Sequence, residues 1–115
     1  MRVLVCGGRD FTDVHMLDDA LDFLHATRGP ITDIIHGGSR GADMLAHEWA
    51  NRNNIRMWPY LADWKTLGRS AGPIRNQRMI DDGRPDMVVA FPGGKGTADM
   101  IKRAEVAGIH VRIVD

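Results

Sequence analysis

The segment Phe-Pro-Gly-Gly-Lys-Gly-Thr, residues 91–97, is the feature that most constrains the fold of this chain. It joins an apolar run over residues 86–91 to a stretch with helical periodicity through three glycines and a threonine. Glycine permits close approach of the main chain, and the free N–H groups of a helix's first turn favour negative charge. A strand that enters a helix through such a junction is suited to hold an anion, most often a phosphate.

Two further junctions have the same character. Gly-Gly-Arg-Asp at residues 7–10 follows the first apolar run, and Gly-Gly-Ser-Arg-Gly-Ala-Asp at residues 37–43 follows the second. Three such junctions in one short chain indicate a phosphate-bearing ligand, and a nucleotide is the leading interpretation.

Short apolar runs alternate with amphipathic stretches, which is the pattern of a parallel sheet covered by helices. Strands are predicted over residues 2–6, 31–36, 55–59, 86–91 and 110–114, and helices over about 13–27, from near 41, over 73–83 and over 97–108. We expect Pro73 to open the third helix and Thr97 to cap the fourth. Residues 60–72 are predicted to form a long connecting loop with a binding role.

The texture of the strands predicts their order. The third and fifth strands alternate apolar and polar residues, as edge strands do, whereas the first and fourth are continuous apolar runs. With right-handed crossovers this favours the order 3-2-1-4-5 in a single Rossmann-like, three-layer α/β domain over residues 1–115. The loops at 7–11 and 92–97 then lie side by side at the switch point, with the loop at 37–43 as the adjacent wall of one pocket.

Charge and cysteine content narrow the classes of protein. Fifteen basic and fifteen acidic residues leave no net charge, so the chain lacks the overall charge on which duplex-binding proteins rely. A single cysteine, Cys6, excludes an internal disulfide and fits a reducing compartment. Without a signal peptide or an apolar run of membrane length, the sequence predicts a cytoplasmic protein with no membrane partner.

Two sharper motif assignments fail. Lys95 is followed by Gly96 rather than by serine or threonine, so the P-loop pattern is missing. His47 and Glu48 begin like a zinc-protease helix, but Asn51 stands where the second histidine belongs. The sequence predicts no metal and no cofactor.

Two side chains near the predicted pocket have both a functional and a structural interpretation. In the functional interpretation, Trp64 stacks on a base while Lys65 or Arg69 contacts a phosphate. In the structural interpretation, Trp64 packs over the edge of the sheet. Arg75, in the first turn of a helix, opposes the dipole, so it either faces a bound anion or forms a surface ion pair.

Three further side chains leave similar alternatives. Asp43 either hydrogen-bonds a ribose hydroxyl or serves the start of a helix. Cys6 is expected to be small apolar packing rather than a reactive thiol. His36 contacts the ligand or bonds a neighbouring carbonyl.

Four motifs resemble a known family. They are Gly-Gly-Arg-Asp-Phe at 7–11, His-Gly-Gly-Ser-Arg-Gly-Ala-Asp at 36–43, Gly-Pro-Ile-Arg-Asn-Gln-Arg-Met at 72–79 and Pro-Gly-Gly-Lys-Gly-Thr-Ala-Asp-Met at 92–100. In this order, and over essentially the whole chain, they resemble the SLOG superfamily, most closely its small YspA/YpsA-related branch of bacteria and phages. The resemblance implies a Rossmann-like fold and a nucleotide or nucleotide-derived ligand. Other members include LOG phosphoribohydrolases, which are commonly dimers, and DprA-type single-strand DNA binders.

The LOG hydrolases carry the motif Pro-Gly-Gly-x-Gly-Thr-x-x-Glu, whose glutamate works with the arginine of an Arg-x-x-x-Met segment. Arg75 and Met79 match that pattern, but Met100 stands where the glutamate belongs. Cleavage of an N-glycosidic bond develops positive charge at the sugar carbon, and methionine cannot stabilise it. The catalytic candidates are therefore Arg75 with Asp99 or Asp43, and enzymatic activity stays open.

The sequence thus predicts a protein that binds a nucleotide or nucleotide-derived phosphate ligand, as a sensor or a nucleotide-processing protein. The alternatives are a LOG-type nucleoside-monophosphate N-glycosidase and a DprA-like single-stranded nucleic-acid binder; the neutral net charge counts against nucleic acid, and a homodimer is possible. The main-chain amides after the fourth strand would hold the phosphate, and Arg75 would offset its charge. The expected ligand contacts are Gly7, Gly8, Arg9, Asp10, Gly37, Gly38, Ser39, Gly41, Asp43, Arg75, Asn76, Gly93, Gly94, Gly96 and Thr97.

Overall fold

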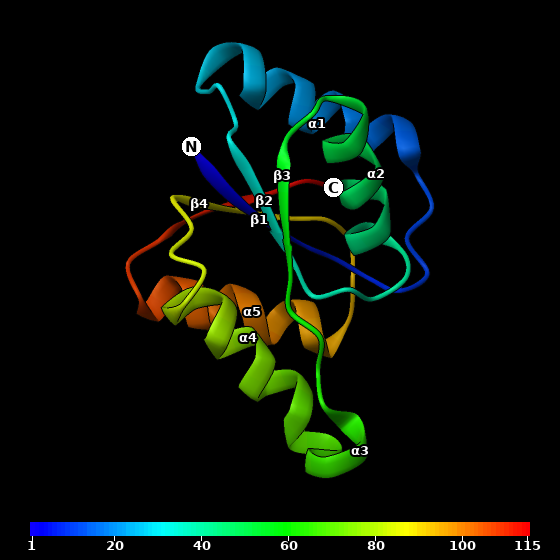
Figure 1. Ribbon diagram of the computed structural model, residues 1–115, viewed down its shortest axis with the longest axis vertical. Coiled ribbons are helices and arrows are strands. Elements are labelled where there is room, and N and C mark those ends of the chain that lie inside the picture. The colour runs from blue at the N-terminus through cyan, green and yellow to red at the C-terminus, as the bar shows by residue number, and fades with distance from the viewer.

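Five parallel strands form the centre of the computed structural model. The structure describes residues 1–115 (Figure 1). The strands are β1 (Arg2–Cys6), β2 (Asp33–His36), β3 (Arg56–Pro59), β4 (Met87–Ala90) and β5 (His110–Ile113). Their order in the sheet is β3-β2-β1-β4-β5, which confirms the predicted order and fold class. The register pairs Val5 of β1 with Val89 of β4 at the centre of the sheet.

Burial explains which strands lie at the edges. All four residues of β2 and of β4 are buried, as are four of the five residues of β1. In contrast, β3 and β5 contain no fully buried residue. Continuous apolar runs therefore occupy the centre, where helices cover both faces, and the alternating runs occupy the edges.

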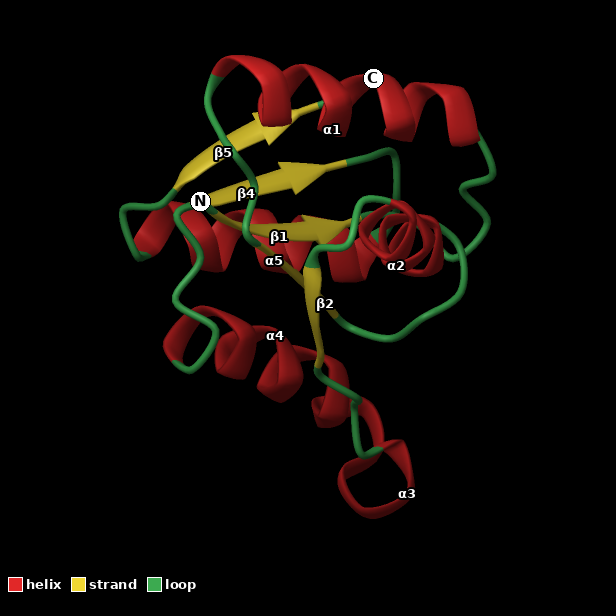
Figure 2. Ribbon diagram, turned by 45° about the horizontal axis from the view of Figure 1, so that its top comes forward, coloured by secondary structure: helices red, strands yellow, loops and turns green.

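Helices cover both faces of the sheet (Figure 2). Helices α1 (Val14–Thr27) and α2 (Ala42–Arg52) pack on one face through a cluster that includes Leu21 and Trp49. Helices α4 (Ala71–Asp81) and α5 (Lys95–Val106) pack on the other face through a cluster that includes Met79 and Met100. None of the helices has the length and apolar character needed to cross a membrane.

The connection between β3 and α4 is more ordered than predicted. Instead of a plain loop, it contains a short helix, α3 (Trp64–Leu67), followed by a 3-10 turn at Gly68–Ser70. Asp63 caps α3, since its carboxylate accepts the Thr66 N–H at 3.2 Å. Helix α3 projects from the body of the molecule beyond the start of α4 (Figure 1).

Two predicted helix starts are wrong by a few residues. Helix α4 begins at Ala71, so Pro73 is its third residue and Arg75 lies in its second turn. Proline is tolerated there because the first N–H groups of a helix have no intrahelical partner. Helix α5 begins at Lys95 with Gly94 as its N-cap, which makes Thr97 the third helical residue rather than the cap.

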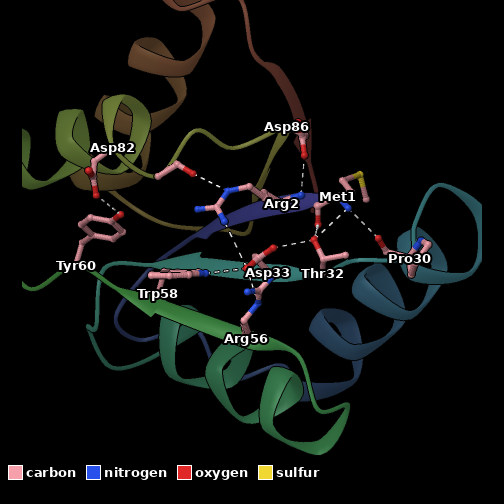
Figure 3. Close-up of polar contacts among 11 residues, drawn as sticks. Met1, Arg2, Pro30, Thr32, Asp33, Arg56, Trp58, Tyr60, Asp82 and Asp86 are labelled. Atoms are coloured by element: carbon pink, nitrogen blue, oxygen red, sulfur yellow. Dashed lines mark hydrogen bonds and ion pairs between the residues drawn. The ribbon is translucent and has the colours of Figure 1, made fainter.

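A polar cluster fixes the amino end of the sheet, opposite the glycine junctions (Figure 3). The buried carboxylate of Asp33 accepts hydrogen bonds from Trp58 Nε1 at 2.8 Å and from Thr32 Oγ1 at 2.7 Å. Arg2 and Arg56 lie 3.4 and 3.3 Å from the same carboxylate. Burial alone would raise the pKa of Asp33, but these hydrogen bonds and charges outweigh it and hold the pKa below its ordinary value.

Candidate functional site

A cavity of about 590 Å³ lies beyond the carboxyl ends of β1, β2 and β4. This is the switch point of the sheet, where open parallel sheets bind their ligands, and the volume is typical of small-molecule sites. Eleven of the fifteen expected ligand contacts line it: Gly7, Gly8, Arg9, Gly37, Ser39, Asp43, Arg75, Asn76, Gly94, Gly96 and Thr97.

Glycine backbones hold the three junction loops together. The Gly8 N–H donates to the Pro92 carbonyl oxygen at 2.8 Å, which places the first and third loops side by side. A Cβ atom on Gly8 would lie 3.0 Å from that same oxygen. Gly41, with φ of 81°, packs directly on the carbonyl groups of Gly8 and Arg9, where no side chain fits. The close approach of the loops therefore depends on glycine.

The amino end of α5 faces the cavity. Gly94, Lys95, Gly96 and Thr97 line the wall here, and the first N–H groups of a helix have no intrahelical acceptor. Cβ atoms added to Gly94 or Gly96 would meet no atom within 4 Å, so the space above these residues is open. Gly93 differs, because a Cβ atom there would collide with Thr97 Oγ1 and lie 2.7 Å from Gly8 N. This end of the cavity can accept an anion on main-chain donors.

Arg75 connects α4 to the loop after β2. Its Nη1 donates to the Gly37 carbonyl oxygen at 2.7 Å and its Nε donates to Asn76 Oδ1 at 3.1 Å. It belongs to none of the five ion pairs of the chain, so the surface ion pair considered from the sequence is absent. Burial lowers the pKa of Arg75, and the nearby Asp43 carboxylate opposes that effect.

Asp43 is a buried carboxylate in the cavity wall. It lies in the first turn of α2, and its Oδ2 accepts the Ser39 N–H at 3.1 Å. Burial raises the pKa of Asp43 to about 6, although the Ser39 hydrogen bond and the charge of Arg75 oppose the shift. Asp43 therefore stabilises the loop that leads into α2, and it also presents to the cavity a carboxyl group whose pKa is raised.

On α5, the side chain that reaches the cavity is that of Asp99 and not that of Met100. Met100 is buried in the core between α5 and the sheet, whereas Asp99 lines the cavity. Asp99 Oδ2 accepts from Arg103 Nε at 2.8 Å and from Asn76 Nδ2 at 3.0 Å. Burial alone would raise the pKa of Asp99, but the hydrogen bonds from Arg103 and Asn76 outweigh it and hold the pKa below its ordinary value.

His36 does not have either role expected from the sequence. It is fully buried, and its Nδ1 accepts the Gly38 N–H at 3.0 Å. That bond leaves the proton on Nε2, which donates to His47 Nδ1 at 2.9 Å. Burial, with the neighbouring His47, lowers the pKa of His36 to about 4, so the ring is neutral. His36 joins β2 to α2 and does not line the cavity.

Cys6 lines the cavity floor but is buried. Burial, with the Asp43 charge, raises the pKa of its thiol to about 12. A thiol that stays protonated is a poor nucleophile, so this supports the packing role expected from the sequence.

Four expected contacts lie outside the cavity: Asp10, Gly38, Gly41 and Gly93. Asp10 is exposed and pairs with Arg40 at 3.1 Å, while the glycines shape the loops. The cavity also includes residues that the list of expected contacts missed, namely Val5, Cys6, Trp64, Arg69, Gly72, Pro73, Met79 and Lys95, besides the catalytic candidate Asp99. Lys65, considered for phosphate binding, is not among the lining residues. The glycine-rich motifs predict which loops line the cavity, but they do not predict the part of its wall that α3 and α4 form.

The balance of charge in the cavity is positive. Four cationic side chains line it, from Arg9, Arg69, Arg75 and Lys95, against two carboxylates, from Asp43 and Asp99. No three His, Cys, Asp or Glu side chains are placed to hold a metal ion.

Comparison with known proteins agrees with these features. The model of the YspA, cpYpsA-related SLOG family matches residues 1–66. The chain is 39% identical over 118 residues to the Gene 61 protein of Mycobacterium phage D29, covering 96% of this chain and 93% of that protein. It also resembles the X-ray structure of TM1055, a Northeast Structural Genomics Consortium target, with a TM-score of 0.69 and 21% identity over 96% of this chain and 71% of that one. The structural likeness shows a shared fold, and the two sequence matches show that the chain belongs to the YspA, cpYpsA-related SLOG family.

Proposed function

We propose that the chain is a single nucleotide-binding domain that holds a nucleotide or nucleotide-derived phosphate ligand in the cavity at the switch point of the sheet. The observation that carries this proposal is the amino end of α5, whose open main-chain donors face a cavity with two more cations than carboxylates. Membership of the SLOG family supports a nucleotide-related function in general.

The phosphate is assigned to the turn at Gly94–Thr97, where main-chain N–H groups and Lys95 neutralise it. Arg75 adds positive charge from α4, where the neighbouring Asn76 donates to the Gly96 carbonyl oxygen at 3.2 Å. The sugar is assigned to Ser39 and Asp43, because a carboxylate oxygen can accept a hydrogen bond from a ribose hydroxyl.

The direct test is mass spectrometry of the native protein incubated with a pool of nucleoside mono-, di- and triphosphates and cyclic nucleotides. The bound ligand and any freed base are read together. An intact nucleotide on the protein supports a carrier or sensor. A protein that retains no phosphate-bearing ligand from the pool contradicts the proposal.

A hydrolase is the second candidate, and one observation favours it. The pKa values of the two carboxyl groups in the cavity are shifted apart, with Asp43 raised to about 6 and Asp99 held below its ordinary value. A pair of this kind is typical of an acid and a base that work together. In the same experiment, freed base with ribose phosphate would support an N-glycosidase. Asp43→Asn should then stop base release while the nucleotide still binds. Unchanged release would mean that Asp43 takes no part in the reaction.

A further inference from the structure

An arginine and a tryptophan from distant segments meet at the cavity. Arg9, from the loop after β1, places its Cζ 5.5 Å from the centroid of the Trp64 ring of α3. Both residues line the cavity, and Trp64 remains 47% exposed. The contact is a cation–π interaction of ordinary geometry.

Trp64 differs from the other two tryptophans in its polar contacts. The indole N–H groups of Trp49 and Trp58 donate to Asp22 and Asp33, at 2.9 and 2.8 Å. Trp64 has no such partner in the chain, and its ring packs near Gly72 at the start of α4. A Cβ atom at Gly72 would lie 3.0 Å from Trp64 Cη2, so glycine is what lets the indole lie against α4. The indole thus packs against α4 while the residue stays about half exposed.

We propose that the Trp64 indole is the stacking platform for the base of the ligand, and that Arg9 leaves this platform to pair with the phosphate. This inference rests on the proposed nucleotide site and adds the base subsite to it. A guanidinium at 5.5 Å leaves no room for a base between itself and the ring. The base and the guanidinium therefore compete for the same face of the indole.

The exchange has a physical reason. A base offers the indole a larger apolar face than a guanidinium does, and the phosphate offers Arg9 a full opposite charge. Each partner of the original pair thus gains a stronger contact when a nucleotide enters. A nucleoside without phosphate gives Arg9 no replacement partner, so it displaces the guanidinium at a net cost.

Three probes separate the two roles: adenosine, ribose 5-phosphate and adenosine 5′-monophosphate, with the guanosine and cytidine series run in parallel. Dissociation constants are measured by calorimetry for the wild type and for Trp64→Leu and Arg9→Ala. Leucine keeps an apolar contact with α4 but has no aromatic face. We expect Trp64→Leu to weaken the binding of the nucleotide and of the nucleoside about tenfold, which is the usual contribution of one stacked base. The affinity for ribose 5-phosphate should be unchanged.

Arg9→Ala should give the complementary pattern. Removal of the guanidinium should weaken the binding of ribose 5-phosphate and of the nucleotide. The nucleoside should bind equally well or more tightly, because the guanidinium no longer competes with the base for the indole. Trp64→Phe should retain most of the affinity for the nucleotide, since the aromatic face remains.

The matched control is a second arginine–aromatic pair in the other helix layer. Arg112 places its Cζ 5.4 Å from the Phe23 ring, and Phe23 is similarly exposed. Phe23→Leu and Arg112→Ala should leave all three dissociation constants unchanged.

Several results would overturn the inference. Equal weakening of ribose 5-phosphate and nucleotide by Trp64→Leu would mean that the indole only supports the fold of the site. Weaker nucleoside binding in Arg9→Ala would mean that the base stacks on the guanidinium instead. If the wild type binds nucleotide but Trp64→Leu binds it equally well, the base subsite is wrong and the phosphate site stands. If the wild type binds none of the probes and also retains no ligand from the nucleotide pool, the proposed function fails as well.

Discussion

Arg75 Nη1 donates a 2.7 Å hydrogen bond to the carbonyl oxygen of Gly37, and this bond joins helix α4 to the loop after β2. A Cβ atom on Gly37 would lie 2.6 Å from the same Nη1 and 3.1 Å from Asp43 Oδ2. Glycine at this position therefore allows a guanidinium and a carboxylate to lie close together on one wall of the cavity. Both charged side chains thus pack against Gly37.

Arg75→Lys tests how much this connection contributes. Lysine keeps the positive charge but cannot bond Gly37 and Asn76 at once, because it lacks the planar fork of arginine. We expect the free energy of unfolding, measured by urea denaturation, to fall by about 1.5–3 kcal/mol. Arg40→Lys is the control, since the ion pair of Arg40 with Asp10 is exposed and should contribute less than about 1 kcal/mol. Equal losses in the two variants would contradict the structural role of Arg75.

Two adjacent glycines before α5 should respond in opposite ways. Gly94→Asn places a favoured N-cap residue where a side chain meets open space, so stability should be kept or should rise by a few tenths of a kcal/mol. The new side chain occupies the main-chain donors assigned to the phosphate, so nucleotide affinity should fall at least about tenfold.

Gly93→Ala should instead lower the free energy of unfolding by about 1–3 kcal/mol, because its Cβ collides with Thr97 and crowds Gly8. Thermal unfolding and calorimetry on both variants check this contrast. If the Gly94→Asn protein folds and binds nucleotide as tightly as the wild type, the phosphate does not bind at the amino end of α5.

The sequence predicts the centre of this fold better than its periphery. Continuous apolar runs identify β1 and β4 as central strands, and with the rule for crossovers this is enough to predict the order of the sheet. Helix α3 is missed because it is a single turn, too short for a periodic pattern. The start of α5 is misplaced because its N-cap is a glycine, which has no side chain to signal a cap.

The candidate site shows the same limit. Glycine-rich junctions predict which loops meet, since the sheet order brings the ends of β1, β2 and β4 together. The roles within a loop depend on contacts between distant segments, which no local pattern records. Gly41 is needed because the carbonyl oxygen of Gly8, distant in sequence, packs directly against it. Trp64 reaches the cavity only because α3 packs against α4.

The Asp33 cluster at the amino end of the sheet should affect stability and not ligand binding (Figure 3). Asp33→Asn removes the charge that balances Arg2 and Arg56, and leaves the partly buried Arg2 without its counter-ion. We expect the free energy of unfolding to fall by about 2–3 kcal/mol at neutral pH.

Arg56→Ala should cost less than about 1 kcal/mol, because this arginine is largely exposed. Nucleotide affinity, measured by calorimetry, should be unchanged in both variants, since the cluster lies at the opposite end of the strands from the cavity. A loss of affinity in Asp33→Asn without a loss of stability would contradict this separation.

The pH dependence of stability should contain two opposing contributions, from Asp43 and His36. Burial raises the pKa of Asp43 from 3.8 to about 6, so the native state binds this proton more tightly than the unfolded state does. Its stabilising contribution is present below about pH 4 and is lost as the pH rises to about 6. Burial lowers the pKa of His36 from 6.5 to about 4, so its contribution is present above about pH 6.5 and is lost as the pH falls to about 4.

Difference profiles separate the two contributions, because the other titrating groups cancel between a variant and the wild type. Asparagine at position 43 can still accept the Ser39 N–H. The stability of Asp43→Asn relative to the wild type should therefore rise by about 3 kcal/mol between pH 4 and 6 and then level off. The stability of His36→Gln relative to the wild type should change in the opposite direction, rising by about 3 kcal/mol as the pH falls from 6.5 to 4. Urea denaturation at half-unit steps of pH measures both, and two flat difference profiles would show that neither group is buried in the way this fold requires.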